Sequence, residues 1–149
     1  MAVRLAGKES GVEYVSSGSL ARTRRIVMEA AINAPVPTEA DAIAHAERLT
    51  RNARNNGDDR GSSYARRARS EWLIAHYGNG KFCGCMWCGR KLTMDTVSAD
   101  RFYPGSEGGS YRRENVGPAC VSCNSGRADK DFFAKSARWG AARQLEAAV

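Results

Sequence analysis

Two C-x-x-C pairs, Cys85-Met-Trp-Cys88 and Cys120-Val-Ser-Cys123, decide how the second half of this chain folds. A C-x-x-C turn brings two thiolates to one ion, and two such turns complete a closed tetrahedral zinc site with no open position. A closed site is structural, and zinc binding contributes about 10 to 16 kcal/mol in small zinc peptides, which is comparable with the whole stability of a small domain. We therefore predict one structural zinc on Cys85, Cys88, Cys120 and Cys123, and a segment that folds only with its metal.

The remaining cysteine, Cys83, is expected to be a free or half-buried thiol and not a ligand. Five cysteines are an odd number, and the pairing of four of them argues against a disulfide framework. A redox role for the pairs is the alternative. It is disfavoured because neither pair is flanked like a thioredoxin-type turn between a strand and a helix.

The chain between the two pairs is pinned at both ends. Residues 91–100, KLTMDTVSAD, have the β-branched content of a strand; residues 102–115 are a turn-rich loop, and VGPAC at 116–120 is a short return strand. Residues 124–148 read as a helix. The predicted fold is therefore α+β, with the zinc stapling a unit of strand, loop, strand and helix.

Two helices are expected before this unit. Residues 35–54 begin at a capping Thr38, carry acidic residues in the first turn, and place His45 on the surface. Residues 63–78 form the second helix, which Gly78 ends. The apolar positions expected to face inward are Ile43, Ala46, Leu49 and Ala53 in the first helix, and Tyr64, Ala68, Trp72 and Ala75 in the second.

The N-terminal segment shows no sustained periodicity. Residues 1–36 mix glycine, serine and valine, so they are expected to form a loosely ordered arm with at most a short strand or helix. The predicted division is an arm at 1–36, a helical basic segment at 37–78 and a zinc-stapled domain at 79–149.

The charge of the chain points to a polyanionic partner. The 149 residues carry a net charge of +7, and the isoelectric point is near 9.5, which suits a protein that binds DNA phosphates. Arginines are dense and acids sparse over residues 48–69, although a basic amphipathic helix pair without a function is the alternative. The predicted DNA contacts are Arg66, Arg67, Arg69, Arg112, Arg113 and Arg127.

Residues 85–92, CMWCGRKL, and residues 98–124, SADRFYPGSEGGSYRRENVGPACVSCN, resemble the HNH endonuclease family. The closest likeness is to the small HNH proteins of phages that infect actinobacteria, and it covers Trp72 to Lys130. The resemblance implies a ββα-metal fold in which a divalent ion, Mg²⁺ or Mn²⁺, sits between loop and helix. Asp100 would be its first ligand and Asn124 its second, and oxygen donors of this kind suit hard cations.

Two further residues complete the site that the resemblance implies. Asn115 would brace the loop. Arg101 stands where most of the family has the general-base histidine, and arginine cannot act as a base at neutral pH. We expect its guanidinium to face the scissile phosphate while metal-bound water supplies the nucleophile. A hydroxyl from Tyr103 or Tyr111 is the alternative.

The function that these patterns favour is metal-dependent cleavage of DNA. The resemblance implies a phage-encoded endonuclease of the host cytoplasm that works beside a terminase in genome packaging. The chain is expected to be soluble, since no window approaches the roughly 18 to 20 apolar residues of a membrane span. One alternative is a zinc-stabilised DNA-binding module that lost cleavage with its histidine. Another is a zinc module that binds a protein.

Overall fold

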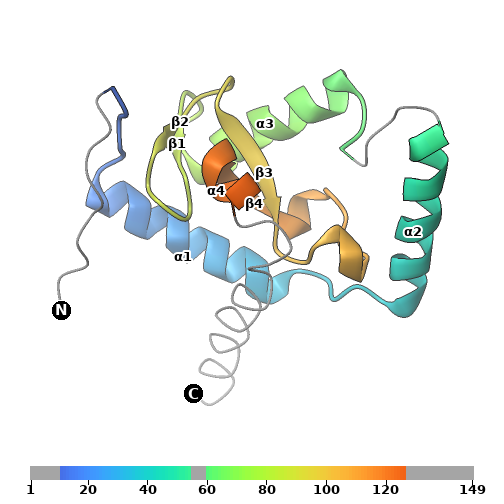
Figure 1. Ribbon diagram of the computed structural model, residues 1–149. Helices are drawn as coiled ribbons and strands as arrows, with labels where there is room; N and C mark the ends of the chain where they lie inside the picture. The colour runs from blue at the N-terminus through green and yellow to red at the C-terminus, as the bar shows by residue number, and fades with distance from the viewer. Residues whose placement is uncertain (1–10, 55–59, 127–149) are drawn as a thin grey trace, which may run out of the picture.

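The computed structural model describes residues 11–54 and 60–126 of the chain. Within them helices and small sheets are mixed, which confirms the predicted α+β class (Figure 1). The helices are α1 (Ser17–Asn33), α2 (Glu39–Arg54), α3 (Ser63–Tyr77) and the short α4 (Val121–Gly126). The strands are β1 (Cys83–Gly84), β2 (Lys91–Leu92), β3 (Val97–Arg101) and β4 (Val116–Cys120), and two 3₁₀ turns are η1 (Gly105–Glu107) and η2 (Arg113–Asn115).

Strands β3 and β4 form an antiparallel pair whose register runs from Val97 opposite Cys120 to Arg101 opposite Val116. The turns η1 and η2 lie in the loop between them, and α4 follows β4 without a break. The predicted order of strand, loop, strand and helix is present, but the strand expected over residues 91–100 is divided into β2, which pairs with β1, and β3, with a turn between them. The helix expected over residues 124–148 falls mostly outside the described residues.

The hydrophobic core joins α1 and α3 to the strands, which lie between these two helices in Figure 1. Tyr77 of α3 is at its centre, because its hydroxyl donates to the carbonyl of Val116 at 3.0 Å while its own carbonyl accepts from the Thr23 hydroxyl at 3.2 Å. Both hydrogen bonds are buried, so they hold the three elements in one arrangement. The core is completed by Val27, Ala31, Leu73, Ile74, Leu92, Val116 and Ala119.

The expectation of a loosely ordered arm is wrong for α1. This helix starts at Ser16, whose hydroxyl accepts from the amide of Ser19, and Val27 on its inner face has no exposed surface. The buried face consists of Thr23, Val27 and Ala31, which are small or polar. A stripe of that composition gives too weak an apolar periodicity to predict a packed helix.

The predicted inward face of α3 is wrong in its register. Leu73 and Ile74 are buried with Tyr77, whereas Tyr64 is 82% exposed and Ala75 is also exposed. The buried apolar residues lie only near the C-terminal end of this helix. The predicted stripe looked stronger in the sequence, but the aliphatic residues near this end meet the strands.

The predicted inward face of α2 is wrong as well. Ile43 and Leu49 are 55% and 46% exposed, whereas His45 is buried and 6% exposed, and the side chain of Ala53 lies outside the part of the chain that the structure describes. The reason is the partner: α2 packs against the glycine-rich turn η1 and not against an apolar layer. At Gly108, with φ of 85°, a Cβ atom would lie 2.6 Å from the backbone nitrogen of Ala42, so the loop and α2 meet backbone to backbone.

Candidate metal centre and the polar site beside it

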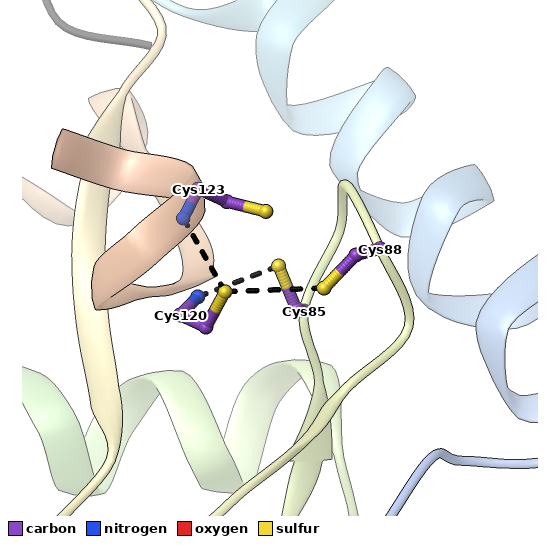
Figure 2. A group of neighbouring side chains, drawn as sticks. All are labelled: Cys85, Cys88, Cys120 and Cys123. Atoms are coloured by element: carbon purple, nitrogen blue, oxygen red, sulfur yellow. Dashed lines mark hydrogen bonds between the residues drawn. The ribbon is translucent and has the colours of Figure 1, made fainter. Parts of the chain in front are cut away.

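The four paired cysteines come together in space, as predicted. Their sulfur atoms all lie within 4.8 Å of one another, and the Sγ atoms of Cys88 and Cys120 are 3.8 Å apart (Figure 2). A tetrahedron with metal–sulfur bonds of about 2.3 Å has edges of about 3.8 Å. The cluster could therefore hold one metal ion, and a set of four thiolates fits zinc.

The cluster is built where two elements meet. Cys85 and Cys88 lie on the turn between β1 and β2, hereafter the knuckle (residues 85–90), while Cys120 ends β4 and Cys123 lies in the first turn of α4. The amide of Cys120 points at Cys85 Sγ, and the amide of Cys123 points at Cys120 Sγ, each at 3.4 Å. Amide donors aimed at sulfur favour the thiolate form that binds metal.

The pKa values of two cluster thiols move in opposite directions. Burial raises the pKa of Cys85 to about 11. Burial also acts to raise the pKa of Cys120, but hydrogen bonds with Ser122 and Cys123 outweigh it and lower the pKa to about 7. Cys83 lies outside the cluster, on β1. It is buried, and burial followed by the nearby Cys85 raises its pKa to about 12.

The knuckle is held from both sides by the N-terminal part of the chain. Arg24 of α1 donates to the carbonyls of Met86 and Trp87 at 3.2 and 2.8 Å. Before α1, the amide of Val15 donates to Gly89, and Lys91 donates its amide to Glu13. The segment expected to be a loose arm thus supports the knuckle of the cysteine cluster.

Trp87 links the knuckle to Asp100, the predicted ligand of a divalent ion. Its indole N–H, between the two knuckle cysteines, donates to Oδ2 of Asp100 at 2.7 Å. Asp100 is 4% exposed, so this hydrogen bond to a charged acceptor lies in a sheltered environment. Asp100 is therefore held by Trp87 of the knuckle as well as by its own strand.

Asn124 lies on the same face of β3 as Asp100. Its amide nitrogen donates to Ser98 Oγ at 3.1 Å and to the carbonyl of Ala99 at 3.2 Å. Side chains two residues apart on a strand share a face, so Ser98 and Asp100 both point toward α4. This face offers a carboxylate and an amide, the oxygen donors that Mg²⁺ takes from proteins when substrate phosphates complete its shell. The donor set fits a hard divalent ion.

Asn115 ties the two ends of the loop together. Its Oδ1 accepts from the amide of Tyr103, and its Nδ2 donates to the carbonyls of Tyr103 and Ser110, all at 2.9 Å. Asn115 is buried, so these three bonds are shielded from water. They fix the loop between β3 and β4 over most of its length.

Arg101 points away from the face that Asp100 occupies. Its Nη1 donates to the carbonyl of Gly109 at 3.2 Å, and its guanidinium lies 4.3 Å from the ring centroid of Tyr111. Arg69 of α3 lies 4.6 Å from the same centroid and donates to the Tyr111 carbonyl. Tyr111 is therefore held by two guanidinium groups, and Arg101 belongs to the packing of the loop.

His45 lies beside Arg101 and Gly105, a position that the sequence did not predict. A Cβ atom built on Gly105 would lie 2.7 Å from His45 Nε2 and 2.7 Å from Arg101 Nη1, so both side chains converge on this glycine. The expectation of a solvated surface histidine is wrong. No periodic signal marks it, because the partner of His45 is a glycine some sixty residues further along the chain.

The predicted DNA-contact arginines fall into two groups. Arg66 and Arg67 of α3 and Arg112 and Arg113 of the loop are exposed, although Arg67 also pairs with Glu71 at 3.2 Å. Arg69 uses its donors on the carbonyls of Tyr111 and Arg60, which gives it a structural task. Arg127 lies outside the described residues.

Comparison with protein-family models, with curated proteins and with solved structures gave no match. Among the helices of residues 11–54 and 60–126, none is long and apolar enough to cross a membrane. Function is therefore inferred from the residues that the fold brings together.

Proposed function

We propose that this protein is a metal-dependent DNA endonuclease whose site resembles that of the HNH family. The observation that carries the proposal is the common face of β3, on which Asp100 lies beside Asn124 and is hydrogen-bonded to Trp87 of the knuckle. The oxygen atoms of the acid and the amide are ligands for a hard cation, whereas the four thiolates next to them are ligands for a softer one such as zinc. We assign Zn²⁺ to the thiolates and Mg²⁺ or Mn²⁺ to the oxygens.

The residues of the chain orient the reaction in this proposal. Trp87 holds one oxygen of Asp100, and Asn124 keeps α4 against β3, so both candidate ligands have fixed positions. Asn115 keeps the loop closed beside them. A divalent ion bound there would neutralise phosphate charge and stabilise the leaving oxygen.

Arg101 and His45 take a supporting role in this proposal. They meet at Gly105 on the side of β3 away from Asp100, and Arg101 is bonded to the loop itself. We therefore assign them to holding the loop in place, and not to the scissile phosphate or to proton transfer.

Binding to DNA is assigned to the exposed arginines. Arg66 and Arg67 lie on α3, and Arg112 and Arg113 lie on the loop that leads into β4. Contacts to phosphates release counterions, so we predict an affinity with little sequence preference that falls steeply between about 50 and 200 mM salt. A fluorescence anisotropy titration at several salt concentrations measures the slope, and a flat profile would remove DNA from this surface.

Cleavage is tested by plasmid nicking with and without Mg²⁺ or Mn²⁺. The Asp100→Asn variant keeps an oxygen for the Trp87 indole but removes the charge, so we expect metal-dependent nicking to fall by at least about a hundredfold while DNA binding stays. Asp95→Asn makes the same chemical change at an exposed position and should cleave like the unmodified protein. Nicking that persists in Asp100→Asn, or that needs no metal, would contradict the proposal.

The second candidate is a DNA-binding module without cleavage. The observation that favours it is Arg101, which occupies the position of the family's base and faces the loop. In that case the unmodified protein binds DNA with the predicted salt dependence and leaves plasmid intact under every metal condition.

A further inference from the structure

Trp72 and His76, one turn apart on α3, form a stacked pair at the surface. Their ring centroids are 4.7 Å apart, and their planes differ by 13°. Trp72 is half-buried and His76 is exposed, so the histidine end of the stack faces solvent. This pair lies outside the polar face of β3 and has no task in the reaction proposed above.

The pair is held rigidly from below by Tyr77. This ring meets Trp72 and His76 edge-on, with centroid distances of 5.8 and 4.8 Å and interplanar angles of 85°. Tyr77 is 2% exposed and is anchored through its hydroxyl to Val116 and through its carbonyl to Thr23. The two outer rings therefore rest on a fixed support, so little side-chain entropy is lost when a ligand stacks on them.

Positive charge lies close to the Trp72 ring of the pair. The guanidinium of Arg113, which comes from η2, lies 5.6 Å from the ring centroid of Trp72. Arg112 is its exposed neighbour, and Arg66 and Arg67 lie at the other end of α3. Aromatic faces inside a basic surface are the combination by which proteins hold unpaired nucleic acid, since bases stack on the rings while phosphates meet the cations.

We propose that Trp72, His76 and Arg113 form a stacking platform for an unpaired base, so that the preferred substrate is DNA with a single-stranded tail or flap. A base inside a duplex has both π-faces covered by its neighbours and cannot stack on a protein ring. The inference rests on the proposed DNA-binding function and deepens it, because it names the class of DNA that the surface selects.

The test compares three probes of equal charge: a blunt duplex, a duplex with an unpaired tail, and a single strand. Anisotropy titrations at one salt concentration compare the unmodified protein with Trp72→Leu and His76→Ala. We expect each variant to lose about tenfold in affinity for the tailed and single-stranded probes and little for the blunt duplex. Trp72→Phe and His76→Phe keep a ring and should retain most of the preference, which separates stacking from damage to the fold. Tyr64→Ala removes an exposed ring at the far end of α3 and should change nothing.

The outcomes distinguish this inference from the one it rests on. If the unmodified protein binds the blunt duplex as tightly as the tailed probe, or if the ring-deleting variants lose all three probes equally, the platform is overturned while DNA binding stands. If the unmodified protein binds none of the probes, both proposals fail.

Discussion

The two faces of β3 differ in what holds them and in what they offer. Toward α4, Asp100 is bonded to Trp87 beside the cysteine cluster, and Asn124 is bonded along the strand. On the other side, Arg101 is packed with Tyr111 and Gly105 and depends on residues from α2 and α3. The side chains of the first face are held in place by the knuckle, and those of the second by packing against other side chains.

This difference explains why Asp-Arg can stand where a resemblance to HNH proteins leads one to expect Asp-His. Neighbours on a strand point in opposite directions, so consecutive residues can serve different purposes. In the proposed function Asp100 would hold the divalent ion, while Arg101 packs against the loop. If Arg101 serves only the loop, Arg101→His should not raise cleavage.

The largest expected effect comes from breaking the face that depends on metal. Cys85→Ser or Cys120→Ser, or removal of the ion by a chelator, should unfold the region around β3, β4 and α4, because about 10 to 16 kcal/mol of binding free energy goes into such folds. Elemental analysis should find one zinc per folded chain, and circular dichroism with tryptophan fluorescence should report the loss.

Cys83→Ala is the matched control for the cysteine changes, because Cys83 is buried but stands outside the cluster. It should keep its zinc. A metal-free protein that is folded and unfolds cooperatively would show that metal binding by the thiolates is not needed to fold this region.

A smaller effect should follow when the packed face is overfilled. In Gly105→Ala the new methyl group meets His45 and Arg101, and forcing an extra carbon into a packed site costs about 1 to 3 kcal/mol. Urea unfolding measures the cost, with the exposed Ser106→Ala as control and zinc content unchanged in both. Equal stability of the two variants would mean that His45 and Arg101 do not enclose this glycine.

The smallest effect is expected from Arg101→Lys, which keeps the charge but loses the planar group that covers Tyr111. A cation–π contact contributes about 0.5 to 1 kcal/mol at exposed sites and more when it is desolvated. The free energy of unfolding should therefore fall by about 1 kcal/mol. Nicking should fall only severalfold. A loss of several orders of magnitude at unchanged stability would place the guanidinium on the substrate and merge the two faces into one site.

The side of the cysteine cluster could be predicted from sequence because the cysteine spacing that defines it is local. The spacing of each C-x-x-C pair alone indicates metal binding, and the two pairs confine the strands and the loop between them. The cluster, the antiparallel hairpin and the α+β class could therefore be predicted. The proposed roles of Asp100, Asn115 and Asn124 came only from the resemblance.

The packed side could not be predicted, because its partners are distant and chemically ordinary. The buried face of α1 is Thr23, Val27 and Ala31, which has little apolar contrast. His45 is buried only because a glycine elsewhere in the chain leaves room for it. In α3, the face that is buried depends on where the strands lie, and the sequence of the helix does not encode their position.

The hydrogen bond from Trp87 to Asp100 sets the smallest piece of this protein that could be moved into another scaffold. A graft of β3, the loop, β4 and α4 alone would leave the carboxylate without its indole and two of the four thiolates without partners. The knuckle must travel with it, and so must α1, because Arg24 caps the carbonyls of Met86 and Trp87. A designer who wants the acid in this position has to transplant three separate stretches of chain, and recombination in nature meets the same constraint.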